Sequence, residues 1–217
     1  MNSTPPLISM GYSPPSNKSP KKGFKYLRSF SKTLLFIVIL VLSLHISHSI
    51  PNELLPDGSR DKELAIQEIF EVLERQPTGL DSVTKEELAK VIYEEALRYD
   101  QDPKFILALI AIESSFQNWS VSSQGARGLM QIMPYVAESL AQEVGIEWIG
   151  DHLLFDPILN IKIGVYYLSK LIQDFSHLTL ALEAYNYGPT YIKHRIANKR
   201  KIRGTYSRKI LVAYQNL

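Results

Sequence analysis

The 217-residue sequence contains no cysteine. This absence excludes disulfide bonds, thiolate nucleophiles, cysteine-ligated metals and a lipid attached to an N-terminal cysteine. The five histidines show no metal-ligand spacing. The sequence therefore predicts no metal site, and we expect no cofactor.

Acidic residues are absent from the first 33 positions. The same segment contains six basic residues: Lys18, Lys21, Lys22, Lys25, Arg28 and Lys32. The rest of the chain then has 18 basic against 22 acidic residues, so its folded part is not basic and nucleic acid is not an expected partner. Residues 1–23 are rich in Pro, Ser, Asn and Lys, and we expect residues 1–33 to form a disordered basic N-terminus.

The sequence also lacks a long, uninterrupted hydrophobic run. The segment from Leu34 to Leu44 is apolar apart from Ser43, and polar residues recur before Ile50. This is shorter than the ~20 residues that a membrane-spanning helix needs. Because a basic flank precedes the apolar core, residues 34–50 are predicted to be an export segment, either a cleaved signal peptide or a retained inner-membrane anchor. A buried core helix is the alternative. Export would place the remainder of the chain in the periplasm or cell envelope.

Alternating strand patterns are absent outside the neighbourhood of residues 129–133, whereas helical spacing and capping signals are frequent. We expect a linker and one helix over 51–83, followed by a mostly α-helical domain over 84–217. A capping box at Thr84 and Glu87, and the pairs Asp102-Pro103 and Asp156-Pro157, mark helix starts. Helices are predicted over 61–75, 84–99, 102–116, 134–145, 156–174, 177–188, 191–197 and 206–217.

Glu113 extends the apolar stripe of the helix predicted over 102–116. The residues three, four and seven positions earlier are Ile110, Leu109 and Ile106. Desolvation, together with the negative end of the helix dipole, should raise the pKa of this carboxyl. A carboxylic acid that is still protonated near neutral pH can protonate a leaving glycosidic oxygen. The alternative is an ordinary glutamate exposed to water at a frayed helix end.

Two further segments could contribute to a binding site. Gly125 to Gln131 combines two glycines, which permit close backbone approach, with an amide side chain suited to sugar hydroxyls and acetamido groups. Ala184 to Pro189 places two tyrosines and an asparagine at a helix end. The alternative for the first segment is a plain turn. The alternative for the second is ordinary core packing of its tyrosines.

Taken together, these segments resemble the catalytic domain of the soluble-type lytic transglycosylases, which are relatives of goose-type lysozyme. The matching motifs are Glu113-Ser114-x-Phe116, Gly125-Ala126-x-Gly128-Leu129-Met130-Gln131-Ile132-Met133-Pro134, Asp156-Pro157-x-x-Asn160-Ile161-x-x-Gly164-x-x-Tyr167-Leu168, Ala184-Tyr185-Asn186-x-Gly188 and Tyr206-x-x-Lys209-Ile210. The resemblance covers roughly residues 89–217. It implies a lysozyme-like α fold and peptidoglycan glycan strands as substrate.

The resemblance also implies a mechanism. The bond between N-acetylmuramic acid and N-acetylglucosamine would be cleaved with Glu113 as acid and then base, and the product would end in 1,6-anhydromuramic acid. The implied substrate-binding residues are Ser122, Met130, Gln131, Tyr185 and Asn186. Two departures bear on the shape of the sugar subsites: Gln117-Asn118 stands where the family usually has Asn-Pro, and Tyr187 stands where an alanine is usual.

Hydrolytic glycosidases generally need a second carboxylate. The candidates are Glu138, Glu143, Glu147, Asp156 and Glu183. Asp156 is better explained as a helix N-cap, and Glu183 lies about 200° around its helix from Tyr185. One carboxyl suffices if the acetamido group and then the 6-hydroxyl of the substrate attack. The rival functions are a lysozyme-type muramidase and a non-catalytic peptidoglycan-binding protein. Six Lys and Arg residues between Lys193 and Arg203 are interpreted as a solvated loop with weak affinity for the cell wall.

Overall fold

The computed structural model describes residues 57–217. The predicted N-terminus (1–33), the export segment (34–50) and the start of the linker lie outside the described residues. Pro56–Leu217 forms one compact unit, so the helix predicted within 51–83 belongs to the same unit as the residues that follow it. No helix within 57–217 combines the length and the apolar character needed to cross a membrane.

The described residues form α-helices joined by loops and two short 3-10 helices. In chain order the elements are α2 (Asp57–Glu74), α3 (Lys85–Arg98), α4 (Pro103–Ser114), α5 (Pro134–Ala141), η2 (Gln142–Val144), η3 (Asp151–Phe155), α6 (Pro157–Phe175), α7 (Leu178–Tyr187), α8 (Pro189–Ala197) and α9 (Thr205–Asn216). Between residues 57 and 217 the backbone has isolated bridges, Val121 with Arg127 and Arg127 with Ile132, but no strand. The predicted mostly α fold class is therefore confirmed.

Local capping chemistry accounts for several helix starts. The Thr84 side chain accepts a hydrogen bond from the Glu87 backbone N–H, and the Glu87 carboxylate accepts one from the Thr84 N–H. Asp102 caps α4 by accepting from the Lys104 N–H, and Asp156 caps α6 by accepting from the Leu159 N–H. The three predicted helix starts are confirmed. They could be predicted because each cap depends on neighbouring residues alone.

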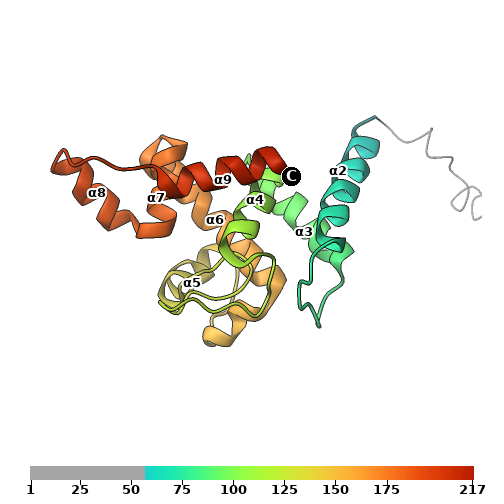
Figure 1. The fold of residues 1–217 in the computed structure, drawn as a ribbon. Helices are drawn as coiled ribbons and strands as arrows, with labels where there is room; N and C mark the ends of the chain where they lie inside the picture. The colour runs from blue at the N-terminus through green and yellow to red at the C-terminus, as the bar shows by residue number, and fades with distance from the viewer. Residues whose placement is uncertain (1–56) are drawn as a thin grey trace, which may run out of the picture. The chain divides into compact units, whose positions relative to one another are not determined.

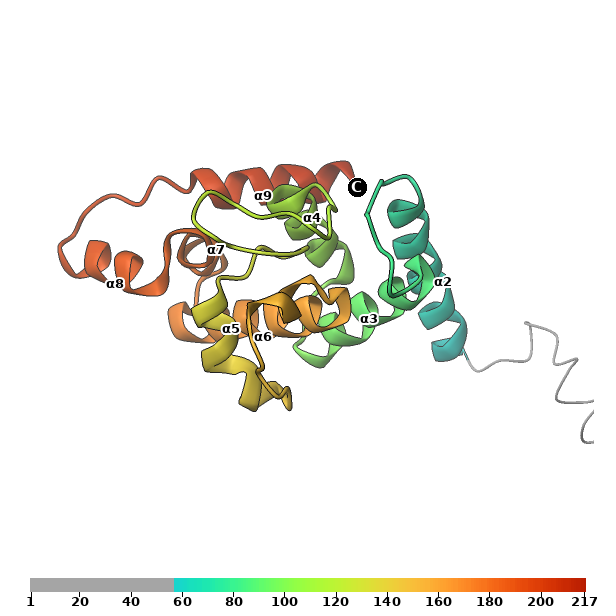
Figure 2. The ribbon, with the colours of Figure 1, turned by 90° about the horizontal axis from the view of Figure 1, so that it is seen from below.

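Helix α4 lies in the core. Every residue from Phe105 to Ile110 is buried. In both views α9 runs alongside α4 (Figures 1 and 2), and α4 also packs against α3. Helix α7 packs against α6, α8 and α9, so it joins the C-terminal helices to the rest of the core. This arrangement brings the end of α4 close to the start of α9, two regions that are distant in sequence.

The end of α4 differs from the prediction. The helix stops at Ser114 instead of near Phe116, and Ser115 and Phe116 both take positive φ angles of 51° and 64°. Phe116 is buried by this sharp turn. Burial of its ring in the core offsets the unfavourable backbone conformation, which non-glycine residues rarely adopt.

The turn after α4 is bound to the connection between α2 and α3. The Gln117 side chain donates a hydrogen bond to the Pro77 carbonyl, and the Asn118 N–H donates to the Thr78 carbonyl over 2.9 Å. The indole N–H of Trp119 donates to the Gly79 carbonyl over 2.8 Å. Three consecutive residues thus bind three consecutive carbonyls, and the Gln117-Asn118 departure from the family pattern lies within this contact.

Candidate active site

Glu113 lies near the C-terminal end of α4 and is partly buried. Burial raises the pKa of its carboxyl to about 7 from an ordinary value of 4.5, which confirms the direction predicted from the apolar stripe. The hydroxyl of Tyr206, in the first turn of α9, donates a hydrogen bond to Glu113 Oε1 and counteracts part of that rise. Near neutral pH a substantial fraction of the protein molecules therefore carry a proton on this carboxyl.

Two buried tyrosines lie near Glu113, and its charge acts on both. Burial raises the pKa of Tyr206 and of Tyr185 far above the usual value, and the Glu113 charge raises both further. Both phenols therefore stay protonated and act as hydrogen-bond donors. The Tyr185 hydroxyl donates to the Met130 carbonyl over 2.9 Å. Tyr206 was part of a matched motif but was not predicted as a site residue, because nothing local indicates a contact with Glu113.

The glycine-containing loop is held against α6 by Asn160. The buried Asn160 side chain accepts from the Met130 N–H over 2.8 Å and donates to the carbonyls of Arg127 and Leu154 over 3.0 and 2.9 Å. A Cβ at Gly128 would lie 2.3 Å from both Asn160 Nδ2 and the Leu154 oxygen, and the φ of Gly128 is +78°. The position therefore requires glycine for its space and its backbone conformation.

A second close contact lies beside the first. A Cβ at Gly164 of α6 would be 2.4 Å from the Met130 sulfur. The Met130 side chain is fully buried in this contact, and Met130 is not among the residues that line a hollow near Glu113. The spacing Met130…Asn160…Gly164 thus corresponds to one packed junction between the loop and α6.

Ser122 and Gln131 shape the same loop. Ser122 Oγ accepts a hydrogen bond from the Ala126 N–H over 3.0 Å, which closes the turn between them. Gln131 has a φ of 50°, and its side-chain amide donates to the carbonyls of Ser120 and Gly128 over 3.1 and 2.9 Å. With its N–H groups directed at the loop, Gln131 can offer its side-chain oxygen as an acceptor to a ligand.

Three of the predicted binding residues share one hollow. Gln131, Tyr185 and Asn186 line a space of about 240 Å³, together with residues of α5, α6 and the turn after α7. Ser122, Met130 and Glu113 do not line it. Glu113 is nevertheless close enough to Tyr185 for its charge to raise the pKa of that phenol. The structure thus brings Glu113, Tyr185 and Gln131 into one neighbourhood, with Ser122 and Met130 in the loop that forms its wall.

Glu183 anchors the helix that contains Tyr206. This buried carboxylate accepts hydrogen bonds from the Ser207 N–H over 2.9 Å and from the Ser207 hydroxyl over 3.0 Å. Ser207 follows Tyr206 in the first turn of α9, where unsatisfied backbone N–H groups and the helix dipole favour a negative charge. Glu183 therefore joins α7 to α9 directly beside the Tyr206–Glu113 hydrogen bond.

The remaining carboxylates that were considered as a second catalytic group are engaged elsewhere or exposed. Asp156 caps α6, and Glu143 binds the Tyr166 hydroxyl and the Lys170 ammonium. Glu138 and Glu147 are exposed. No carboxylate contributes to the raised pKa of Glu113, which burial and Tyr206 determine. Across residues 57–217, no three His, Asp or Glu side chains come together as metal ligands.

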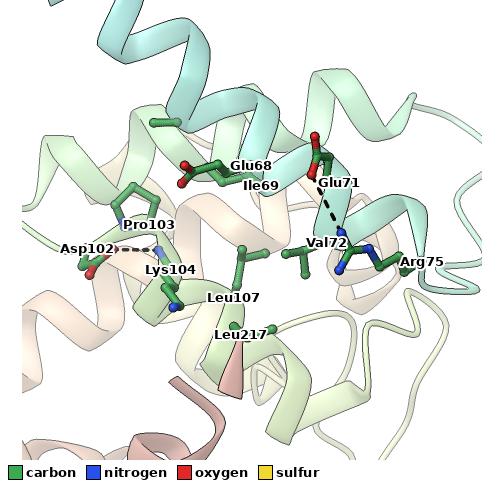
Figure 3. Close-up of a pocket in the computed structure, with 11 residues that line it drawn as sticks. Glu68, Ile69, Glu71, Val72, Arg75, Asp102, Pro103, Lys104, Leu107 and Leu217 are labelled. Carbon is green, nitrogen blue, oxygen red and sulfur yellow. Dashed lines mark hydrogen bonds and ion pairs between the residues drawn. The ribbon is translucent and has the colours of Figure 1, made fainter. Parts of the chain in front are cut away.

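A separate hollow of about 260 Å³ lies between α2 and α4, beside Leu217 (Figure 3). Two of its acidic groups are already engaged: Glu71 contacts Arg75 at 3.8 Å, and Asp102 caps α4 at the Lys104 N–H, as Figure 3 shows. None of the predicted site residues lines it. The neighbourhood of Glu113 is therefore the candidate active site.

The chain is similar to several bacterial and phage enzymes over parts of their length. It is 34% identical over 101 residues to the soluble lytic murein transglycosylase of Salmonella typhimurium, covering 46% of this chain and 16% of that protein. It is 38% identical over 87 residues to the membrane-bound lytic murein transglycosylase E of Buchnera aphidicola, covering 38% of this chain and 40% of that protein. The transglycosylase of Enterobacteria phage PRD1 is 33% identical over 91 residues, which cover 42% of this chain and 31% of the phage protein.

Among solved structures, an inactive mutant of the lytic transglycosylase Slt from Pseudomonas aeruginosa matches 58% of this chain and 21% of its own, with 28% identity and a TM-score of 0.47. The chain spans less than half the length of each of these relatives. The sequence model of the Transglycosylase SLT domain matches residues 90–207, which is more than half of the chain and includes Glu113, the glycine loop, Tyr185 and Tyr206. The chain belongs to the transglycosylase SLT domain family.

Proposed function

We propose that this chain is a peptidoglycan lytic transglycosylase that cleaves the β-1,4 bond between N-acetylmuramic acid and N-acetylglucosamine. The observation that carries the proposal is the partly buried Glu113, whose pKa of about 7 suits a group that must give up a proton and later take one back. Family membership and the names of the relatives agree with this activity.

In the first step Glu113, in its protonated form, donates its proton to the glycosidic oxygen while the bond to the sugar carbon breaks. A general acid is most effective when its pKa lies near the working pH, because it is then largely protonated and still acidic enough to transfer its proton. As the proton leaves, the Tyr206 hydroxyl stabilises the carboxylate that forms.

In the second step the substrate supplies the nucleophiles. Asp156, Glu143 and Glu183 are each bound to other groups, so they are poor candidates for holding a covalent intermediate or activating water. The acetamido group of the muramic acid residue can stabilise the positive charge. The Glu113 carboxylate then removes the proton from the 6-hydroxyl of the same sugar, which closes the 1,6-anhydro ring. Because that hydroxyl is tethered, its effective concentration can far exceed that of water.

The binding residues divide into two groups in this proposal. Gln131, Tyr185 and Asn186 line the hollow and would contact the sugars. Ser122 and Met130 would act through the loop: Ser122 closes its turn, and Met130 packs it against α6. The proposed catalytic domain includes the loop from 77 to 79, because that loop binds the turn directly after α4.

The product distinguishes this activity from its two rivals. Purified protein should release muropeptides with anhydro ends, each lighter by one water than a lysozyme product, and mass analysis of the digest identifies them. Reducing ends would show that water, instead of the 6-hydroxyl, attacks the intermediate and that the chain is a muramidase.

The Glu113→Gln protein should lose about 10²–10⁴-fold or more in rate while it still folds and binds glycan. If wild-type protein binds glycan strands without cleaving them, the chain is a binding protein.

The proposed substrate lies outside the cytoplasmic membrane, so the proposal includes export to the periplasm or cell envelope through residues 34–50, as a cleaved signal or as an inner-membrane anchor. A periplasm-dependent reporter enzyme fused after residue 60 should be active. A mature protein that starts near Ile50 would identify a cleaved signal, and a full-length membrane-bound protein would identify an anchor. An inactive periplasmic reporter, together with an active cytoplasm-dependent reporter at the same fusion site, would contradict export.

A further inference from the structure

Three tyrosines line a second hollow beside the candidate active site. Tyr135 of α5, Tyr187 at the end of α7 and Tyr191 of α8 are 66%, 53% and 48% exposed. They border a space of about 710 Å³ that also contacts Tyr167 and His194. Large aromatic side chains that are exposed together around one concave surface are typical of a binding site, whereas single exposed aromatics need no such explanation.

This second hollow adjoins the hollow lined by Gln131 and Asn186, with which it shares lining residues. Tyr135, Tyr167 and Tyr187 line both. Tyr167 connects them further, because its ring lies 5.3 Å from the Tyr185 ring. Burial and the neighbouring Tyr135 raise the pKa of Tyr167 to about 12, so its hydroxyl remains a donor at neutral pH. A chain-like ligand bound at the first hollow could therefore continue into the second.

The α8 wall of the second hollow is held in place before any ligand binds. The Tyr187 and Tyr191 rings lie 5.9 Å apart. Arg195 donates a hydrogen bond to the Tyr191 hydroxyl over 3.1 Å, and its guanidinium lies over the Tyr191 ring at 5.7 Å. The same guanidinium donates to the Lys201 carbonyl in the loop before α9. A rigid tyrosine wall loses little conformational entropy on binding, which favours affinity.

We infer that Tyr135, Tyr187 and Tyr191 form an additional sugar subsite, which binds pyranose rings of the glycan strand beyond those held at Gln131 and Asn186. The inference rests on the proposed function. The apolar face of a pyranose packs on a tyrosine ring, and the phenol and His194 can bind its hydroxyls. The hollow falls within the roughly 300–1,000 Å³ typical of small-molecule sites, so a sugar ring fits it. Tyr187 replaces the small residue usual in the family, so the subsite would be a feature of this chain.

The test measures affinity against ligand length. Full-length Glu113→Gln protein, which cannot complete the reaction, is titrated by calorimetry with N-acetylglucosamine oligomers from the disaccharide to the hexasaccharide. Affinity should rise when the oligomer becomes long enough to reach Tyr191. Tyr191 lines the second hollow but not the first, so adding Tyr191→Ala should weaken the longest oligomers and leave the disaccharide unchanged. The expected loss is about three- to tenfold, since aromatic contacts contribute about 0.5–1.5 kcal/mol. Tyr191→Phe keeps the ring and should retain most of the affinity.

The outcomes separate this inference from the proposed function. If no oligomer of any length binds, the proposed function itself fails. If oligomers bind but Tyr191→Ala has no effect at any length, the subsite is overturned. An equal loss at every length would also overturn it, because Tyr191 would then contact the sugars bound at the first hollow. Tyr187→Ala, at a residue that lines both hollows, should weaken the longest oligomers as well.

Discussion

The hydroxyl of Tyr206 donates a hydrogen bond to the carboxylate of Glu113, although the two residues are 93 positions apart in sequence. This bond favours the ionised carboxylate and lowers the pKa of Glu113, whereas burial raises it by more. The pKa near 7 is therefore a balance between the apolar face of α4 and a single donor from α9.

Replacing Tyr206 with phenylalanine should shift that balance. Without the donor the pKa of Glu113 rises, so the alkaline limb of the kcat/KM profile, where the acid loses its proton, should move to higher pH. Tyr214→Phe is a matched control, because Tyr214 is also on α9 and its hydroxyl binds the Asp102 carboxylate at the surface. The control should leave the profile unchanged. Identical profiles for wild type and Tyr206→Phe would contradict the proposed coupling.

The raised pKa of Glu113 also predicts how stability depends on pH. Between 4.5 and about 7 the native state binds more protons at this residue than the unfolded chain does. The associated stability is fully present below about 4.5 and is lost as pH rises through about 7. Glu113→Gln cannot ionise, so it should gain stability relative to wild type between pH 5 and pH 8, by at most about 3 kcal/mol. Urea unfolding at both pH values measures the difference, and a pH-independent difference would refute this reading.

Gly128→Ala should disrupt the junction between the loop and α6. The new Cβ would enter the space of Asn160 Nδ2 and the Leu154 oxygen, at a backbone φ of +78°. We expect a loss of about 3 kcal/mol or more, because backbone strain adds to broken buried hydrogen bonds. Gly145→Ala has a similar φ of +71° but open space around it, so it should cost about 1 kcal/mol. Equal losses in thermal or urea unfolding would show that sterics at Asn160 are unimportant.

Glu183 is predicted to position Tyr206. Glu183→Ala removes both acceptor contacts to Ser207 and should lower kcat by about tenfold or more, with a shift of the alkaline limb in the same direction as in Tyr206→Phe. Glu183→Gln keeps a carbonyl oxygen for the Ser207 N–H and hydroxyl, and it should retain most of the activity and the wild-type profile. If the Glu183→Ala protein is less stable but has the wild-type pH profile, Glu183 has a structural role only and does not position Tyr206.

The parts of the structure that were predictable depend on neighbouring residues. Thr84 with Glu87, Asp102 and Asp156 mark helix starts because a cap acts within three residues. The raised pKa of Glu113 followed from the helical spacing of Ile106, Leu109 and Ile110. The early end of α4 was not predictable from the local pattern, because it accompanies the burial of Phe116 in the core by a turn in which Ser115 and Phe116 take positive φ angles.

The same distinction applies to the candidate site. Motif spacing selected Gln131, Tyr185 and Asn186, which share one hollow. It could not show that the Met130 side chain faces Gly164 instead of a ligand, because that orientation depends on how the loop packs on α6. The contact between Tyr206 and Glu113 depends on the packing of α9 against α4, which no local signal encodes.

The binding of Gln117, Asn118 and Trp119 to the carbonyls of Pro77, Thr78 and Gly79 has a consequence for mechanical coupling. A force applied to α2 has one route through these hydrogen bonds to the turn directly after α4, beside the routes through the packing of α2 on α3 and α4. Tension along this route would act on the C-terminal end of α4, where Glu113 lies.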